Sequence, residues 1–213
     1  YKYGFGVEKD LFTSMQLLTI AQDKDPEASY LLGCNYYKPP TISEEDKKKA
    51  KSKVFIKQDY ELAFHYFLQA KDYVPAQNFL GLCYLNGTGV KANIFEAYKY
   101  FSLAAKGGSI EAMYNLANFY LSYKSDDSNY TKAIVDLLTE AANKYHMGAA
   151  LKLSEFYKNG QYVEKDEKKA SYYSNIGSEQ TKHDSQFSFA LLKLTGHEVT
   201  KDTYVAFSTF KHC

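Results

Sequence analysis

The residues most able to do chemistry in this chain are its five histidines and three cysteines, since imidazole and thiolate groups are common metal ligands and nucleophiles. The histidines share no spacing typical of metal ligands. The cysteines include no C-x-x-C pair, and their odd number argues against a disulfide framework, so we expect buried, reduced thiols. No Ser/His/Asp or Cys/His arrangement emerges. The sequence therefore predicts no catalytic residue, no metal site and no cofactor. The residues concerned are His65, His146, His183, His197, His212, Cys34, Cys83 and Cys213.

Two glycine-rich segments, Gly87-Thr-Gly89 and Gly4-Phe-Gly6, have the small residues that a phosphate-binding loop requires. Neither follows a predicted strand, neither has a third glycine at the required spacing, and no Gly-Lys-Ser/Thr occurs in the chain. Both recur at the same place in a longer sequence period. We therefore interpret them as turn glycines.

The charge of the chain is nearly balanced, with 26 basic and 25 acidic residues, so no overall positive field favours nucleic acid or a membrane surface. All the basic residues are lysines, which disfavours any mechanism that needs a bidentate guanidinium. No stretch approaches the roughly 18 apolar residues of a membrane span, so we expect no membrane insertion.

The compartment stays open between the cytoplasm and the lumen of the endoplasmic reticulum. Two glycosylation sequons occur, Asn86-Gly-Thr88 and Asn129-Tyr-Thr131, and roughly one is expected by chance. Asn129 also falls on a predicted helix-cap position, where its side chain is already used. Only Asn86 is therefore a candidate for glycosylation.

The elements that position these residues are indicated by one short pattern, in which a small residue lies four residues after an Asp or Asn. From the second copy onward the spacings are 34, 36, 37 and 36 residues, and the first spacing is 49. A fixed period in this range indicates a stack of supersecondary units. We expect the Asp or Asn to cap a helix and the small residue to lie where two helices cross. The pairs are Asp10/Ser14, Asp59/Ala63, Asn93/Ala97, Asn129/Ala133, Asp166/Ala170 and Asp202/Ala206.

The clearest copy covers residues 75–108. Apolar residues spaced three and four apart predict a first helix over 76–84, and Asn93 caps a second helix over 94–105. A small residue in the middle of the first helix would let the partner helix approach the backbone closely. That position holds Gly33, Gly81, Ala117, Ser154 and Ala190 in successive copies.

Two loops depart from the pattern. A charged insertion over residues 38–58 explains the long first spacing, and the segment 122–128 lacks the Gly-x-Gly-Val turn. The insertion contains both lysines and acidic residues, so we expect a solvated loop, disordered or helical. The alternative is a regulatory segment that binds an anionic partner.

These residues resemble the Sel1-like repeat, a member of the tetratricopeptide-type helical superfamily. The family pattern is Ala-x-x-x-Leu-Gly-x-x-Tyr, then Gly-x-Gly-Val, then Asp, Ala, an aromatic residue, Ala-Ala and Gly, and residues 75–108 carry nearly all of it. The resemblance implies an all-α, right-handed superhelical solenoid of antiparallel helix pairs. It covers residues 1–213 as a single solenoid, except the insertion at 38–58, and the chain is read as a piece of a longer protein.

The resemblance also implies where a partner would bind, since the concave face of such a stack is lined by first helices. The exposed inner positions are expected three residues before, one after and four after the small residue. A groove of this composition would suit an extended peptide, with rings for contact area and amides for backbone hydrogen bonds. The alternative is that half of these residues pack on neighbouring repeats. The positions are Tyr30, Cys34, Tyr37, Asn78, Leu82, Leu85, Tyr114, Asn118, Leu121, Leu151, Glu155 and Lys158.

The leading functional hypothesis is a non-catalytic scaffold or adaptor that binds a partner protein or peptide. Similar repeats occur in the lumenal adaptor of endoplasmic-reticulum-associated degradation, in fungal chitin-synthase activators and in bacterial proteins that engage hosts. The alternative is a regulatory helical domain of a larger enzyme or membrane-complex subunit. The sequence leaves the oligomeric state open.

Overall fold

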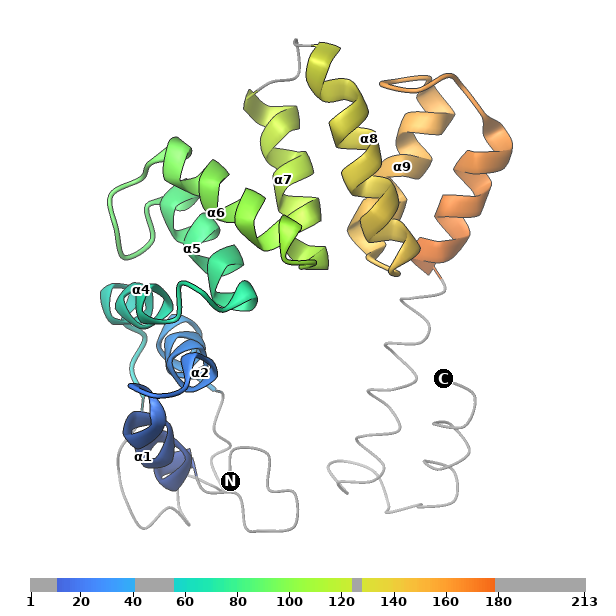
Figure 1. Cartoon of the computed structure of the whole chain (residues 1–213). Coiled ribbons are helices and arrows are strands. Elements are labelled where there is room, and N and C mark those ends of the chain that lie inside the picture. The colour runs from blue at the N-terminus through green and yellow to red at the C-terminus, as the bar shows by residue number, and fades with distance from the viewer. Residues whose placement is uncertain (1–10, 41–55, 124–127, 179–213) are drawn as a thin grey trace, which may run out of the picture. The chain divides into compact units, whose positions relative to one another are not determined.

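The computed structural model describes residues 11–40, 56–123 and 128–178, and every regular element within these ranges is a helix (Figure 1). None of the helices in the described part combines the length and apolarity needed to cross a membrane. The helices are α1 (Leu11–Ala21), α2 (Pro26–Tyr37), α4 (Tyr60–Gln69), α5 (Val74–Asn86), α6 (Ile94–Lys106), α7 (Ile110–Tyr123), α8 (Ser128–Asn143) and α9 (Met147–Asn159), and residues 167–178 are also helical.

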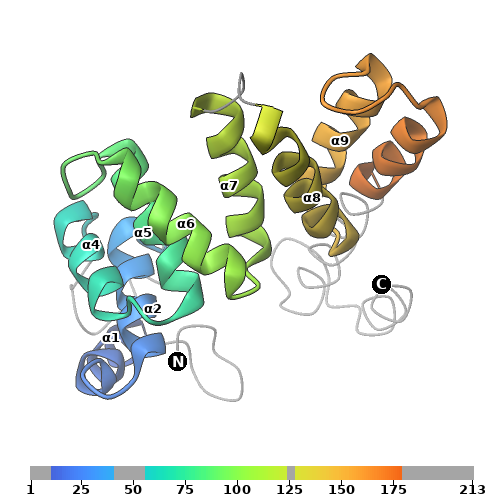
Figure 2. The ribbon, with the colours of Figure 1, turned by 45° about the horizontal axis from the view of Figure 1, so that its top comes forward.

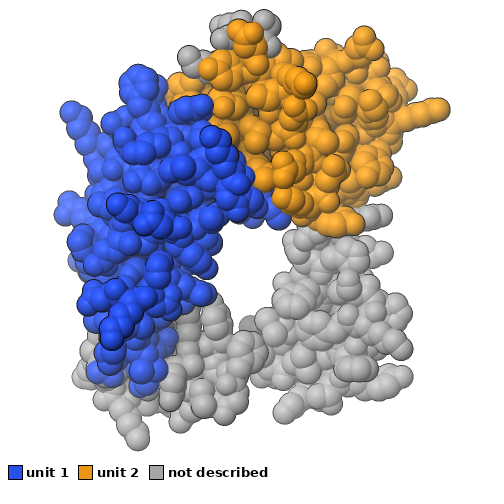
Figure 3. All heavy atoms as spheres, viewed as in Figure 1, with its two compact units in different colours: residues 1–112 blue, residues 113–213 orange. Residues whose placement is uncertain are grey.

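The chain divides into two compact units, residues 1–112 and 113–213, coloured in Figure 3. In unit 1, α1 packs on α2, α2 on α4, α4 on α5, and α5 on α6; in unit 2, α8 packs on α9. Helices α7 and α8 lie side by side in both ribbon views (Figures 1 and 2). The predicted all-α fold of paired helices is confirmed. A single continuous solenoid over all 213 residues stays a prediction.

The predicted second-helix caps form at Asp59, Asn93 and Asp166. In each case a side-chain oxygen accepts a hydrogen bond from the backbone N–H of the second or third residue that follows, at 2.9–3.3 Å. A cap of this kind stabilises a helix by about 1 kcal/mol. The repeated Asp or Asn therefore starts three of the second helices by a local interaction.

The cap predicted at Asn129 is wrong. Helix α8 begins at Ser128, so Asn129 is the second helical residue and not the cap. This is the copy whose preceding loop lacks the Gly-x-Gly-Val sequence. The remaining two cap positions, Asp10 and Asp202, lie outside the described residues.

In the pairs α2–α4 and α5–α6, the small residue of the first helix lies where a large ring of the second helix crosses it. A Cβ atom added to Gly33 would lie 2.6 Å from the Phe67 ring, and one added to Gly81 would lie 2.5 Å from the Phe101 ring. Both rings are completely buried. The close approach of the two helices in these repeats therefore depends on glycine.

Each cap residue also closes the loop between the two helices of its repeat. Its backbone N–H donates to the carbonyl of a tyrosine near the end of the first helix. The closing hydrogen bond is also present in the repeat that carries the insertion. There, Gln58 Nε2 donates a further hydrogen bond of 2.8 Å to the neighbouring Tyr37 carbonyl. The two helices of this repeat therefore stay joined at their loop ends. The closing hydrogen bonds are Asp59–Tyr36 (3.1 Å), Asn93–Tyr84 (2.8 Å) and Asp166–Tyr157 (2.9 Å).

The same three tyrosines stack on a tyrosine of the second helix. Ring centroids lie 5.7–5.8 Å apart with interplanar angles of 6–12°. These stacks hold the loop end of each helix pair together with apolar surface and offset ring contacts. They join Tyr36 to Tyr66, Tyr84 to Tyr100 and Tyr157 to Tyr173.

Candidate functional site: a partner-binding surface

The described histidines serve structural or surface roles. His65 is exposed on α4, and its ring meets the ring of Tyr66 edge-on. His146 is the N-cap of α9, where Nδ1 accepts a hydrogen bond of 3.0 Å from the Ala149 N–H. Within the described ranges no group of three or more His, Cys, Asp or Glu residues could hold a metal ion. His183, His197, His212 and Cys213 lie outside those ranges.

Cys83 and Cys34 are free thiols, as expected. Cys83 is buried in the core of unit 1, and burial raises its pKa to about 12. At neutral pH it is therefore a protonated thiol and a poor nucleophile. Cys34 is half-buried and packs against the same cluster. Both cysteines act as small apolar residues.

The predicted binding residues on α2 mainly join neighbouring helices. The ring of Tyr30 lies 5.4 Å from that of Tyr73 and 5.9 Å from that of Phe79, at the start of α5. The ring of Tyr37 lies 5.4 Å from that of Tyr60 on α4 and 5.6 Å from that of Phe79. Both tyrosines are half-buried and pack on the ring of Phe79 in the next repeat.

On α5, Asn78 was expected to be exposed, and this expectation is wrong because only 7% of the residue is exposed. The equivalent position on α2 is Tyr30, which faces the following first helix. The position three residues before the small residue was assigned to the inner surface from the sequence. It is therefore partly a contact between repeats. Leu82 and Leu85 are half-buried.

On α7, Tyr114 occupies the same register as Tyr30 and Asn78. Its ring centroid lies 4.5 Å from that of His146, the cap of the following first helix. A Cβ atom added to Gly148 would lie 3.0 Å from Tyr114 Cζ, so the two segments are in close contact. Asn118 and Leu121 are half-buried. Tyr114 therefore has a packing role as well.

Helix α9 differs, because its predicted residues Leu151, Glu155 and Lys158 are all exposed. Leu151 is 48% exposed. Sequence reasoning missed Met147, which is 41% exposed and lies one helical turn before Leu151. Residues spaced four, four and three apart share one helix face. We call Met147, Leu151, Glu155 and Lys158 the α9 stripe.

A second exposed apolar group on α6 was also missed. Phe95 is 80% exposed, and its neighbours Ile94 and Tyr98 are also exposed. Comparison of the sequence copies gave no clear signal for it, because this position varies in type. Counted from the cap, the other copies hold Phe12, Glu61, Thr131, Lys168 and Tyr204.

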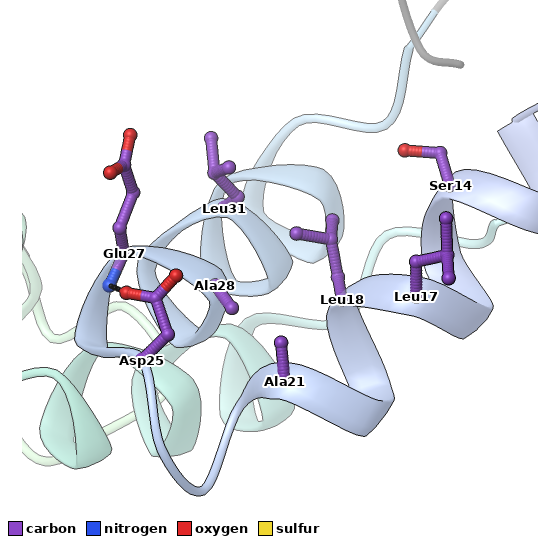
Figure 4. Close-up of a pocket in the computed structure, with 8 residues that line it drawn as sticks. All are labelled: Ser14, Leu17, Leu18, Ala21, Asp25, Glu27, Ala28 and Leu31. Atoms are coloured by element: carbon purple, nitrogen blue, oxygen red, sulfur yellow. Dashed lines mark hydrogen bonds between the residues drawn. The ribbon is translucent and has the colours of Figure 1, made fainter.

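A pocket lies between α1 and α2 (Figure 4). Its walls are mostly apolar, and its polar rim includes Asp25, whose Oδ1 accepts a hydrogen bond of 2.9 Å from the Glu27 N–H. Histidine and cysteine are absent from the described lining, so the pocket has no nucleophile–base pair. It is lined by Ser14, Leu17, Leu18, Ala21, Asp25, Glu27, Ala28 and Leu31.

Comparison with protein families matches one model, the Sel1 repeat, over residues 1–23, 53–72, 74–109, 110–144 and 148–181. The gap between the first two matches, residues 24–52, contains α2 and most of the charged insertion, whose end lies in the second match. The matches over 74–109 and 110–144 each contain one helix pair, α5 with α6 and α7 with α8. The family agrees with the resemblance drawn from the motif. Sel1 repeats are generally protein–protein interaction modules and are typically non-catalytic.

Among curated proteins, the chain is similar to chitin synthase regulatory factor 2 of Schizosaccharomyces pombe, with 30% identity over 130 residues. The match covers 59% of this chain and 25% of that protein. The chain thus spans about a quarter of the relative.

Two solved structures share the fold. One is c5321, a protective antigen of uropathogenic Escherichia coli with an SLR fold, at TM-score 0.67 and 20% identity over 99% of this chain and 43% of that chain. The other is a Sel1 repeat protein from Oxalobacter formigenes, at TM-score 0.62 and 25% identity over 93% of this chain and 75% of that chain.

Proposed function

The chain belongs to the Sel1 repeat family, and we propose that it acts as a non-catalytic scaffold that binds a partner protein or peptide. The single observation that carries this proposal is the exposed α9 stripe. The residues that recur from repeat to repeat have structural roles in caps, helix crossings and ring stacks. Specific recognition therefore belongs at positions that do not repeat, and the α9 stripe is such a position.

The chemistry of the α9 stripe indicates the kind of partner. Met147 and Leu151 present apolar surface near the start of the helix, and Glu155 and Lys158 present opposite charges near its end. Flexible apolar side chains adapt to a bound surface, and rim charges steer and orient it more than they tighten it. The stripe suits a peptide or helix with two apolar anchors followed by complementary charges.

The experiment compares two substitutions in the full-length protein, purified with its partners from its own source. Leu151→Asp is expected to reduce the recovery of a specific partner at least tenfold, while the protein stays folded. Phe95→Asp is the matched control, because it puts the same charge at an exposed apolar position of another helix. Partner recovery that falls with Phe95→Asp and not with Leu151→Asp would refute the α9 stripe as the binding surface.

A second candidate function is regulation of a larger enzyme or membrane complex. The observation that favours it is the 30% identity with a chitin synthase regulatory factor, over 130 residues. Under this proposal the repeats would bind a subunit of a polysaccharide synthase. The test is chitin synthase activity in cells of the source organism that carry or lack the full-length protein. Unchanged activity in both would exclude this alternative.

A further inference from the structure

The first helices of the described repeats begin with different cap residues. Asp25 caps α2 through a carboxylate oxygen, and Ser109 Oγ accepts a hydrogen bond of 3.2 Å from a backbone N–H in the first turn of α7. Tyr73 precedes α5 and makes no side-chain cap bond. His146 caps α9 through a ring nitrogen. Of these residues, histidine is the one whose charge ordinarily changes between pH 5 and 8.

The His146 cap requires a neutral imidazole ring. Nδ1 accepts a hydrogen bond of 3.0 Å from the Ala149 N–H, so the hydrogen bond assigns the ring proton to Nε2. A protonated imidazole has no acceptor atom, so this bond is lost when the ring takes up a proton. The cation would also lie at the positive end of the helix dipole, and the first turn of α9 contains no acidic residue to offset it.

His146 lies where α7 and α8 meet the start of α9. Its ring centroid is 4.5 Å from that of Tyr114 on α7, and its backbone N–H donates a hydrogen bond of 3.0 Å to the Ala141 carbonyl near the end of α8. A Cβ atom added to Gly148 would lie 3.2 Å from His146 Cε1 and 3.0 Å from Tyr114 Cζ. A change at this cap therefore acts on a tightly packed junction of three helices.

The ionisable groups on α7 and α8 do not replace the lost acceptor. On α7 they are the Tyr114 phenol and the carboxylate of Glu111, which precedes Tyr114 by three residues and shares its helix face. At the end of α8, Lys144 and Glu140 form an ion pair of 3.0 Å with each other. A carboxylate on a neighbouring helix offers a counter-charge to a protonated ring, but it does not restore the acceptor that Nδ1 gives to α9.

The remaining neighbours of the cap carry little charge. The last described helix reaches the start of α9 through Gly177, where an added Cβ atom would lie 3.8 Å from the Met147 carbonyl oxygen. Its residues 174–178 contain no ionisable side chain. The adjacent Tyr145 is 63% exposed, and the first ionisable residue within α9 is Lys152, more than one turn after the cap. Protonation of the ring therefore gains no compensating contact from α9 itself.

We propose that His146 makes the start of α9 sensitive to pH, with the first turn capped above about pH 7 and loosened as the pH falls through the histidine range. A proton on Nδ1 excludes the cap, so the stabilisation is present where the ring is neutral and is lost towards acidic pH. The affected turn includes Met147, the first residue of the α9 stripe. The inference goes beyond the proposed function and holds whether or not the stripe binds a partner.

The experiment compares the unmodified chain with His146→Asn at about pH 8 and about pH 5, the limits of the histidine range. Asparagine is a good N-cap residue that does not titrate, so this variant keeps a cap at both pH values. In the unmodified chain, the protection of the Ala149 N–H from hydrogen exchange, corrected for the intrinsic rate, is expected to fall about fivefold towards pH 5. The Tm is expected to fall by about 2–4 °C more than in His146→Asn. Equal pH dependence in the two chains would overturn the proposal.

A second readout follows the ring of His146 directly by NMR. The Nε2–H tautomer is expected at about pH 8, and a protonated ring at about pH 5. His65→Asn removes the exposed imidazole of α4, so it is the matched control and is expected to leave the pH dependence of the Ala149 N–H unchanged. A ring that stays neutral at the lower pH, or one that protonates while the Ala149 N–H stays protected, would equally overturn the proposal.

Discussion

Units 1 and 2 build the same two turns with different residues. The first turn holds Gly89 in unit 1 and Tyr162 in unit 2, with φ of 71° and 63°. The second turn, after the second helix, holds Gly108 and Tyr145, with φ of 88° and 63°. A left-handed conformation costs a residue with a side chain roughly 1–2 kcal/mol, so unit 2 retains strain that unit 1 avoids.

Glycine is favoured at Gly89 and at Gly108 of unit 1 for different physical reasons. A Cβ atom on Gly89 would overlap the backbone carbonyl of Tyr60 at the start of α4, whereas one on Gly108 would meet nothing within 4 Å. Tyr162 instead packs its ring on Phe156, at a centroid distance of 4.9 Å. The turn itself therefore tolerates a side chain, and only the neighbouring backbone requires glycine at Gly89.

The largest expected effect is that of Gly89→Ala, which combines left-handed strain with a backbone clash. We expect a loss of about 3–5 kcal/mol in the free energy of unfolding, measured by urea denaturation. Gly108→Ala is the matched control, with strain alone and an expected loss of about 1 kcal/mol. Equal losses for the two variants would contradict the close approach at Gly89.

Gly81→Ala is expected to rank second. The added methyl group would press on the buried Phe101 ring, which is a case of overpacking that costs about 2–3 kcal/mol. Phe101→Leu in the same chain is expected to recover part of the loss, because it makes room at the crossing. Additive losses in the double variant, measured in a double-mutant cycle, would show that the two side chains do not share the space.

Ser154→Ala probes the same crossing in unit 2 and is expected to have a smaller effect. Ser154 Oγ donates a hydrogen bond of 2.8 Å to the Ala170 carbonyl, so this crossing is held by a polar contact where unit 1 has glycine under a ring. Its removal is expected to cost about 1 kcal/mol. Ser154→Gly gives the control, and a gain in stability there would show that unit 2 prefers the arrangement of unit 1.

The smallest expected effect is a gain. Tyr145 is 63% exposed, so Tyr145→Gly removes left-handed strain with little loss of packing. We expect an increase of about 0.5–1 kcal/mol in the free energy of unfolding, followed as a rise in Tm. Tyr145→Ala keeps the strain and removes the ring, so it should show no gain. A gain of equal size in both variants would assign the effect to the ring.

Local interactions were the part of this fold that the sequence made predictable. Asp59, Asn93 and Asp166 bind backbone N–H groups two or three residues away, so their capping role depends on few neighbours. Cys83 was likewise predictable as a buried thiol from its place in an apolar stripe. The cap predicted at Asn129 was wrong: its loop departs from the sequence pattern, and α8 begins one residue before it.

What the sequence by itself determined was the repeat: its period, its caps, and the small residues where helices cross. Only the tertiary structure decided which of the non-repeating residues reach solvent. Tyr30 and Leu151 occupy the same register, yet Tyr30 packs on the rings of Tyr73 and Phe79, whereas Leu151 lies against Gly177 and stays 48% exposed. The reason is physical: a cap depends on its own chain within one helical turn, whereas exposure depends on a neighbouring helix that the residue's own sequence does not specify.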